Sequence, residues 1–348
     1  MARYTARMKM DRRRFLQTGA VLGAAAAAGC MERDAGSGEE AAPAAETTVE
    51  PLYRISLAEW SYFRELFGPS LSALADGSFG DVLETDPRSL YQGQLDHLDF
   101  PARARGLGIE AVEYVNTFFF DRARDGEYLA DLKSRCDGEG VTSLLIMCDA
   151  EGDIGDPDAA ARTQTVENHH KWVEAAAFLG CHSVRVNAAS AGSFEEQQKL
   201  AADGLRQLCE YADAYGIDIL VENHGGISSN GEWLAGTLAM VDHARIGSLP
   251  DFGNFRVSEE PEEWYDRYEG VTELMPFARA VSAKSYDFDG NGDETTIDYE
   301  QMMRIVLDAG YRGWVGIEFE GRMGADAGIV KTKELLERLR DELAPEYA

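Results

Sequence analysis

The chain has 348 residues, of which 45% are hydrophobic, so it is long enough to bury a large core. Its formal net charge of -29 excludes binding to a nucleic-acid backbone, because an acidic surface repels phosphate groups. We read this charge as a solvated acidic surface that keeps the protein soluble, and it carries no information about the fold.

The first 29 residues resemble an export signal. They carry six basic residues and one acidic residue, and residues 12–17 (Arg-Arg-Arg-Phe-Leu-Gln) resemble the twin-arginine motif. A weakly apolar segment follows at residues 18–28, which is too short to span a bilayer. A charged start before a short apolar run is typical of a signal peptide. We therefore predict a signal peptide at residues 1–29 and export by the twin-arginine route to the periplasm.

The segment after the signal predicts an anchor and a linker. Residues 27–30 (Ala-Ala-Gly-Cys) resemble a lipobox, in which Cys30 would be lipidated and become the new N-terminus. This lipid is the only membrane attachment that we expect, and the alternative is cleavage at the small residues 24–26, which would give a soluble periplasmic protein. Residues 30–51 are rich in Ala, Glu, Gly and Ser and predict a flexible linker.

From residue 53 onward, short apolar runs alternate with amphipathic stretches, as in repeated βα units with a parallel sheet. Strands are expected at residues 55–60, 109–115, 141–148, 183–187, 217–222, 245–251, 280–285 and 314–318. Residues 62–87 are expected to form an irregular loop over the barrel mouth. Helices are expected at residues 89–106, 128–139, 157–179, 194–215, 231–243, 261–277, 297–309 and 329–343. The fold class predicted is α/β, with a single (β/α)8 TIM barrel over residues 52–348.

The cysteines beyond Cys30 show no metal-ligand spacing. They stand at positions 136, 148, 181 and 209, without any Cys-x-x-Cys pair. We expect buried free thiols at these positions.

Three of the expected strands end in a carboxylate. Glu222, Asp251 and Glu318 follow the fifth, sixth and eighth apolar runs. A (β/α)8 barrel keeps its chemistry at the carboxyl ends of its strands, so these three side chains should meet at one mouth. Gathered carboxylates repel one another unless a cation or protons neutralise them, and a divalent ion such as Mn²⁺, Mg²⁺ or Co²⁺ is the natural counter-ion. A carboxylate near the substrate can then move a proton between carbons.

These strand ends resemble a known family. Val-Glu-Asn-His-Gly-Gly at residues 221–226, Leu-Pro-Asp-Phe-Gly-Asn at 249–254 and Gly-Ile-Glu-Phe-Glu at 316–320 are similar to the xylose isomerase-like TIM barrel superfamily of sugar phosphate isomerases and epimerases. The resemblance covers roughly residues 53–340. It implies that one divalent metal is bound by Glu, Asp, His and Glu from strands five to eight. It also implies that Glu222 and Glu318 form the acid/base pair.

The chain departs from this pattern on the seventh strand. The family often carries His-x-Lys-Asp there, whereas this chain has Ser282-Ala283-Lys284-Ser285, so Ser282 stands at the position of the expected histidine ligand. Either a water held by Ser282 completes an all-oxygen site, or the Lys284 ammonium replaces the metal charge, or His224 reaches in. We favour a metal because three carboxylates exceed what one lysine neutralises.

Three polar residues beside these ligands are further candidates for the chemistry. Lys284 is expected to bind a substrate oxygen or stabilise an enolate, and the alternative is an ion pair with Glu318 or Asp251. His224 is expected to act as a general acid/base or to bind a substrate hydroxyl group, and the alternative is a histidine hydrogen-bonded beside the strand. Asn254 stands where relatives place a substrate-binding polar residue.

Side chains on the earlier strands are candidates for binding substrate hydroxyl groups. Glu113, Arg185 and Asn187 lie on strands that relatives use for this purpose, and the alternative is pairing of Arg185 with Glu113 inside the barrel. Trp60 is a candidate for an apolar rim, with core packing as its alternative.

The function predicted is an isomerase or epimerase acting on an unphosphorylated sugar or keto-sugar, by metal-assisted proton transfer between Glu222 and Glu318. A keto-sugar or keto-glycoside lyase or dehydratase would begin with the same proton abstraction, and a non-catalytic sugar-binding lipoprotein is the third alternative. An endonuclease related to this superfamily would need a histidine-rich site, and the chain has six histidines. The oligomeric state is not predicted.

Overall fold

The computed structural model describes residues 51–73 and 77–347. The predicted signal peptide, Cys30 and all but the last residue of the predicted linker lie outside these ranges, so export and lipidation stay predictions. Within the described ranges, no helix is both long and apolar enough to cross a membrane.

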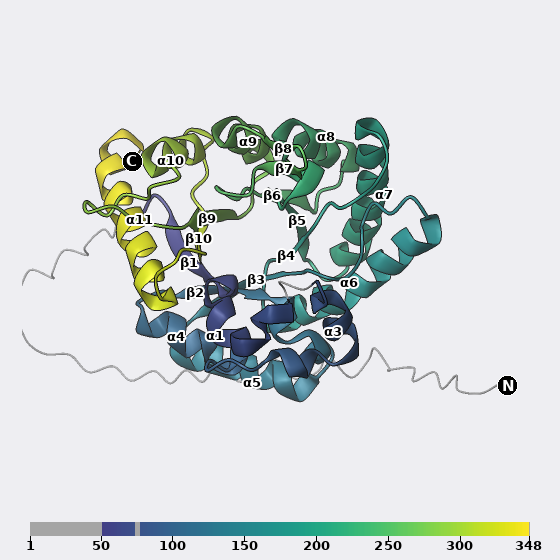
Figure 1. Cartoon of the computed structure of the whole chain (residues 1–348), viewed down its shortest axis with the longest axis horizontal. Coiled ribbons are helices and arrows are strands. Elements are labelled where there is room, and N and C mark those ends of the chain that lie inside the picture. The colour runs from purple at the N-terminus through teal and green to yellow at the C-terminus, as the bar shows by residue number, and fades with distance from the viewer. Residues whose placement is uncertain (1–50, 74–76, 348) are drawn as a thin grey trace, which may run out of the picture. The chain divides into compact units, whose positions relative to one another are not determined.

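Eight parallel strands form the centre of the fold. They are β1 (Arg54–Ala58), β2 (Ala111–Val115), β3 (Thr142–Met147), β4 (Ser183–Val186), β5 (Asp218–Glu222), β6 (Ile246–Leu249), β9 (Val281–Ser285) and β10 (Trp314–Phe319). They pair in the order β6-β5-β4-β3-β2-β1-β10-β9. Bridges between Ser248 and Ala278 and between Asp251 and Ser282 join the two ends of this order and close the barrel. Figure 1 shows helices around these strands, which confirms the predicted (β/α)8 TIM barrel.

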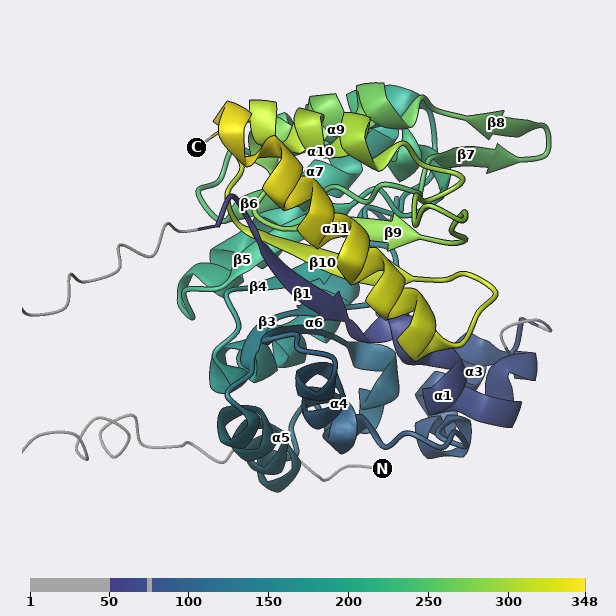
Figure 2. The same cartoon turned by 90° about the vertical axis from the view of Figure 1, so that its left-hand side faces the viewer.

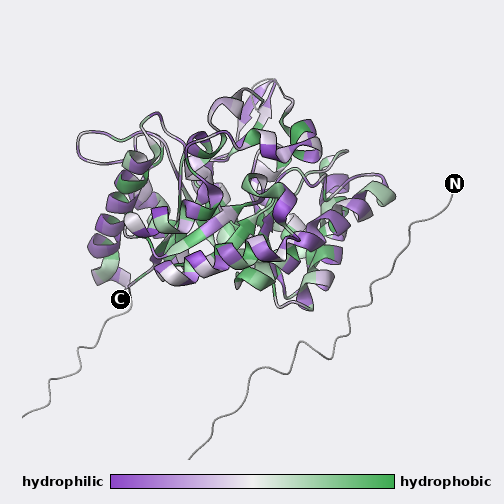
Figure 3. Cartoon of the chain, turned by 90° about the horizontal axis from the view of Figure 1, so that it is seen from below, coloured by the Kyte–Doolittle hydropathy of each residue, from purple (hydrophilic) through white to green (hydrophobic). Residues whose placement is uncertain are grey.

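The helices are defined by recognisable caps. They are α1 (Phe63–Phe67), α3 (Phe79–Thr85), α4 (Phe100–Gly106), α5 (Gly126–Glu139), α6 (Ala159–Leu179), α7 (Phe194–Asp213), α8 (Gly231–Val241), α9 (Arg267–Leu274), α10 (Tyr299–Asp308) and α11 (Ala325–Tyr347). Asp125, Asp158 and Asp298 each accept a backbone hydrogen bond at a helix start, and Ser193 forms a capping box with Glu196. Apolar residues gather on the strands and the inward helix faces (Figure 3).

The helix predicted at residues 89–106 is wrong over its first half. The chain forms a short 3-10 turn at Pro87–Leu90 and another at His97–Asp99, and α4 begins only at Phe100. Gly93 explains the break, because its backbone donates a hydrogen bond to the Leu66 carbonyl oxygen and a Cβ there would lie 1.8 Å from the Glu65 carbonyl oxygen. The segment is therefore fixed against α1 by a close backbone approach that a helix cannot provide.

The helix predicted at residues 261–277 is also wrong at its start. An antiparallel hairpin made of β7 (Arg256–Glu259) and β8 (Glu262–Trp264) precedes α9 and extends beyond the barrel strands in Figure 2. Asp266 accepts hydrogen bonds from the backbone N–H groups of Tyr268 and Glu269, so the helix begins after Asp266.

The structure also places the cysteines and the segment at residues 62–87. Cys136, Cys148, Cys181 and Cys209 are buried and free, as predicted. In its described part, the stretch at residues 62–87, expected to be irregular, contains α1, α3 and a 3-10 turn at Gly68–Leu71, and it ends where the turn at Pro87–Leu90 begins. This segment packs through Phe67, which contacts Trp60, Phe79 and Phe118, and so it builds an aromatic cluster at the mouth of the barrel.

Candidate active site

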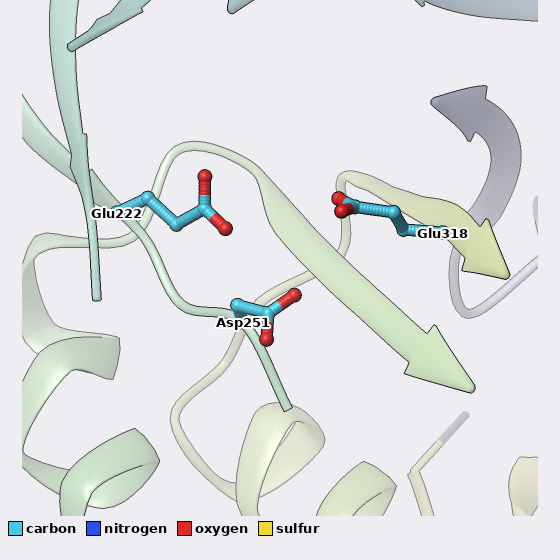
Figure 4. A group of neighbouring side chains, drawn as sticks. All are labelled: Glu222, Asp251 and Glu318. Atoms are coloured by element: carbon cyan, nitrogen blue, oxygen red, sulfur yellow. The ribbon is translucent and has the colours of Figure 1, made fainter. Parts of the chain in front are cut away.

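The three strand-end carboxylates converge, as predicted from the sequence. Glu222 ends β5, Asp251 follows β6 and Glu318 lies near the end of β10, and all three are buried. One carboxylate oxygen of each lies within 4.8 Å of the others. Figure 4 shows the three groups directed toward one another from three segments of the chain. The barrel therefore concentrates negative charge at one point.

Asp251 is held rigidly at the base of this cluster. Its Oδ1 accepts hydrogen bonds of 2.8 Å from the backbone N–H groups of Gly253 and Asn254. The buried amide of Asn223 joins the ends of β5 and β6, because its Nδ2 donates to the carbonyl oxygens of Asp251 and Asn254 and its Oδ1 accepts from the Asp251 N–H. Asn223 thus sets the position of Asp251 relative to Glu222.

Ser282 and Lys284 enter the cluster from β9. The Ser282 Oγ lies 2.7 Å from Asp251 Oδ2 and 3.2 Å from Glu318 Oε2, so it bridges these two carboxylates. The Lys284 Nζ donates to Glu318 Oε1 at 2.6 Å and to Glu320 Oε1 at 3.0 Å, and it lies 3.9 Å from Asp251 Oδ2. The ion pair of Lys284 with Glu318 is the alternative that the sequence left open, and it is formed here.

Glu222 is flanked by one cation and one amide. Arg185 Nε lies 2.8 Å from Glu222 Oε2, as an ion pair whose angle falls outside hydrogen-bond geometry. Asn254 Nδ2 donates to Glu222 Oε1 at 3.0 Å. Glu222 Oε2 is therefore buried without a hydrogen-bond donor among the described residues, and the Arg185 guanidinium offsets its charge.

Arg185 does not pair with Glu113, and that alternative is wrong. Arg185 Nη1 donates to Asp149 Oδ1 at 2.8 Å and to Asn187 Oδ1 at 3.1 Å, while Asn187 Nδ2 donates to Asp149 Oδ1. Arg185 lies on β4, Asn187 directly follows that strand and Asp149 lies just beyond β3. Their side chains form a hydrogen-bonded network beside Glu222. The sequence did not identify Asp149 as a partner.

Glu113 occupies a separate position inside the barrel. Its Oε1 accepts a 2.6 Å hydrogen bond from Ser56 Oγ, and its Oε2 has no hydrogen-bond partner among the described residues. A Cβ on Gly316 would lie 2.5 Å from Glu113 Oε1, so the glycine on β10 makes room for this carboxyl group. Glu113 is therefore buried between its neighbours on β1 and β10.

A cavity of about 330 Å³ opens beside the carboxylate cluster, where it is lined by Glu318 and by Arg185 and Asn254, which contact Glu222. Trp60 and Phe79 form an apolar wall on one side, and Asp149, Arg185, His224, Asn254, Lys284, Glu318 and Glu320 are among the polar residues around the rest. Trp60 stacks on Phe63 at 5.2 Å and hydrogen-bonds Glu320, which fixes its ring at the rim. An apolar wall facing convergent polar groups suits one sugar ring.

Burial raises the proton affinity of all three carboxylates, and the neighbouring cations oppose this effect. Burial raises the pKa of Glu222 to about 7, against the opposing effect of Arg185. Burial also raises the pKa values of Asp251 and Glu318, although Lys284 opposes both shifts. Burial alone would lower the pKa of Lys284, but Glu318 and its neighbours raise it well above its ordinary value. Lys284 is therefore charged, and the carboxylates are poised to exchange protons.

The charge states of two residues at the rim of the cavity are also set by their surroundings. Burial would raise the pKa of Asp149, but the Arg185 guanidinium holds it well below its usual range. Desolvation by the protein around the imidazole, followed by the Arg185 charge, lowers the pKa of His224, although the residue remains accessible to solvent at the mouth. His224 is thus a neutral imidazole that solvent and substrate can reach.

The donor set fits a hard divalent cation. Oxygen ligands lie about 2.0–2.6 Å from Mg²⁺ or Ca²⁺, so two ligands of one ion are at most about 5 Å apart, and the three carboxylates satisfy this limit. All three side chains offer carboxylate oxygens, which are the ligands that Mg²⁺ and Mn²⁺ prefer, and the three charges exceed the single charge of Lys284. The cluster of Glu222, Asp251 and Glu318 is a possible acidic metal site, with Ser282 beside two of its members.

Three residues of the site could have been found from the sequence. Glu320 lies two residues beyond Glu318 and therefore shares its face of the strand. Asp149 and Asn223 each stand directly at a strand end. Phe79 gave no such signal, because it belongs to an inserted helix that only tertiary packing brings to the mouth.

Solved structures with the same fold support this architecture. A xylose isomerase-like TIM barrel protein from Mycobacterium smegmatis, solved in complex with magnesium, matches with a TM-score of 0.58 and 17% identity, over 84% of this chain and 98% of that one. An L-ribulose 3-epimerase matches with a TM-score of 0.61 and 15% identity, over 84% and 96%. At these identities the likeness is one of fold.

Curated relatives match over shorter stretches. The C-glycoside deglycosidase alpha subunit of Arthrobacter globiformis is 41% identical over 88 residues, which is 25% of this chain and 23% of that protein. The fructoselysine 3-epimerase of Escherichia coli O157:H7 is 27% identical over 42% of this chain and 53% of its own. The inosose dehydratase of Clostridium beijerinckii is 27% identical over 36% and 48%. The match thus spans about a quarter to a half of the length of these relatives.

A family model extends over most of the barrel. The model described as xylose isomerase-like TIM barrel matches residues 101–342, from the second residue of α4 to a point within α11. This range contains the strand ends that carry Glu222, Asp251, Lys284 and Glu318. With a match over more than half of its length, the chain belongs to the xylose isomerase-like TIM barrel family.

Proposed function

We propose that this protein is an enzyme that transfers a proton at a carbon next to the carbonyl group of a sugar or keto-sugar, which makes it an isomerase or epimerase. The observation that carries this proposal is the pair Glu222 and Glu318, two buried carboxylates that face each other across Asp251. Burial raises both pKa values, and it raises that of Glu222 to about 7, so Glu222 can take up and release a proton near neutral pH and Glu318 holds a proton more readily than an exposed glutamate.

The chain's own residues account for the proton movements. Glu222 takes the proton from the carbon, and the electron pair of the broken C–H bond moves to the carbonyl oxygen to give an enolate. Glu318 returns a proton to the same carbon from the opposite side, which inverts it, or to the neighbouring carbon, which isomerises the sugar. Lys284 donates to Glu318 and holds it in place for this step.

Glu222, Asp251 and Glu318 would hold one divalent ion, with Ser282 beside them. Such an ion polarises the carbonyl and stabilises an enediolate in chemistry of this kind. Mn²⁺, Mg²⁺ and Co²⁺ suit an all-oxygen donor set, and a fold relative was solved with magnesium.

An unphosphorylated sugar is favoured by the charge around the cavity. The cations there are already engaged, because Lys284 pairs with Glu318 and Glu320, and Arg185 pairs with Glu222 and Asp149. A phosphate group would meet more carboxylates than free cations and would be repelled. The predicted export of the protein supports the same substrate class.

Elimination is a second candidate function, because the relatives include a C-glycoside deglycosidase alpha subunit and an inosose dehydratase. It begins with the same loss of a proton to Glu222, and the enolate then expels a leaving group from the next carbon. Glu318, whose pKa is raised by burial, would protonate that group. Analysis of products separates the two reactions, because elimination releases water or an aglycone and epimerisation does not.

Solvent-deuterium exchange tests the proposal. Wild-type protein should incorporate deuterium from D2O into members of a keto-sugar panel, as followed by proton NMR. Glu222→Gln and Glu318→Gln should each abolish the exchange, whereas Glu127→Gln, at an exposed position on α5, should retain it. Sugar binding without exchange in the wild type would contradict the proposal and favour a binding protein.

A further inference from the structure

A second cavity lies beside the first one at the barrel mouth. Its volume is about 520 Å³, and it is lined by the glycines that follow β5 and β6, by Tyr286 after β9 and by the β7–β8 hairpin. Asn254 lines both cavities, and its amide also contacts Glu222. The two spaces are therefore adjacent across a residue of the candidate active site.

The hairpin presents an aromatic ring to this outer cavity. Trp264 lies directly opposite Arg256 in the register of β7 and β8, so the two side chains share one face of the hairpin. The Trp264 side chain is 54% exposed, although it lines the cavity. An exposed indole beside a cavity is available to stack on the flat face of a ring.

The floor of the outer cavity is kept open by glycine. Gly225 and Gly226 have φ values of +82° and +60°, and a Cβ at either position would meet no atom within 4 Å. At Gly253 the space is tight instead, because a Cβ would lie 2.6 Å from Tyr286 Oη and 2.7 Å from Lys284 Cγ. A side chain at these positions would narrow the outer cavity or press on Lys284.

We propose that the outer cavity is a subsite for a second ring attached to the reacting sugar, so that the substrate is a glycoside and not a free monosaccharide. This inference rests on the proposed function, because it assumes that the reacting sugar lies in the inner cavity. The inner cavity, at about 330 Å³, suits one ring. The second ring stacks on Trp264, and the hydroxyl groups of Ser258 and Tyr286 are available to its polar edge.

The charges of the outer cavity suit a neutral ring. Arg256 is paired with Glu259 at 2.6 Å, so the described residues that line this cavity include no unpaired cation to select an anionic group. An aromatic aglycone and a second sugar ring share the required chemistry, which is a flat face with limited polarity. The test below separates these two sources.

Calorimetric titration of the full protein tests the subsite with methyl β-D-glucoside, phenyl β-D-glucoside and cellobiose, and with the corresponding galactosides. Wild type should bind a ring-bearing compound about 3- to 10-fold more tightly than the methyl compound, as expected for one stacking contact. Preference for the phenyl compound identifies an aromatic aglycone, and preference for the disaccharide identifies a sugar ring. Equal affinities across the series, or binding of none of its members, would overturn the proposal.

Variants assign the preference to Trp264. Trp264→Ala should remove it and Trp264→Phe should retain most of it, while Phe178→Ala, another exposed aromatic on α6, should leave it unchanged. The same loss in Trp264→Ala and Phe178→Ala would contradict a role for the hairpin. Ring preference without deuterium exchange would reject the proposed reaction alone, and exchange without ring preference would reject the subsite alone.

Discussion

Lys284 Nζ lies 2.6 Å from Glu318 Oε1, and this buried ion pair joins β9 to β10 inside the mouth of the barrel. The same ammonium contacts Glu320 and lies 3.9 Å from Asp251. A single cation therefore offsets part of the charge of three carboxylates. Glu222, on the other side of the cluster, forms its ion pair with Arg185 instead.

Removing the Lys284 charge should destabilise the protein strongly. Lys284→Met keeps the length of the side chain but leaves buried carboxylates unpaired, and we expect a loss of about 3–5 kcal/mol in the free energy of unfolding. Urea denaturation measures this loss, and Lys331→Met, at an exposed pair with Glu334, is the control. Equal losses in the free energy of unfolding for the two substitutions would contradict a stabilising role of the buried pair.

Glu113 should make stability depend on pH. Its pKa is raised by burial from an ordinary value of 4.5 to about 7, so the folded state prefers the protonated carboxyl group. The stability that this preference contributes is complete below pH 4.5 and is lost as the pH rises through 7. Between pH 5 and pH 8 the wild type should lose roughly 2–3 kcal/mol more than Glu113→Gln, whose amide stays neutral. Parallel pH profiles of the two proteins in denaturant titrations would contradict this assignment.

Divalent ions should raise the melting temperature of protein that has been treated with a chelator and dialysed. An ion present at 100 times its dissociation constant adds about 2.7 kcal/mol, or several degrees for a barrel of this size. Calorimetry with Mg²⁺, Mn²⁺ and Co²⁺ should detect the shift in wild type and in Glu127→Gln. Glu222→Gln should lose it, because it removes an anionic ligand. No shift with any of the three ions would reject the metal site.

Asn223 should be a positioning residue for Asp251. Asn223→Ala removes three hydrogen bonds at a fully buried position, and we expect a loss of about 2–4 kcal/mol in stability. Displacement of Asp251 should also weaken the melting shift caused by Mg²⁺, which a purely structural role would leave intact. The exposed Asn291→Ala should change neither quantity. An unaltered Mg²⁺ response in Asn223→Ala would reject the positioning role.

The strands of the barrel could be predicted because each is buried on both faces and therefore reads as a short apolar run. The carboxylates at residues 222, 251 and 318 stand out at the ends of such runs. The segments 89–99 and 256–266 could not be predicted. Glutamates at residues 259–263 favour a helix by local propensity, but the chain forms a hairpin there in spite of that propensity. The segment 89–99 is fixed by contacts of Gly93 with α1, which are distant in sequence.

The sequence alone determined the barrel and the convergence of Glu222, Asp251 and Glu318, because parallel strands place their carboxyl ends on one side of a sheet. The tertiary structure decided which charges neighbour each carboxylate. Arg185 forms ion pairs with Glu222 and Asp149, whereas Glu113 accepts a hydrogen bond from Ser56. Pairing of this kind depends on the rotation of side chains across a closed barrel and on distances of a few ångströms. Neighbours along the chain do not encode those distances, whereas the alternation of apolar runs encodes the barrel itself.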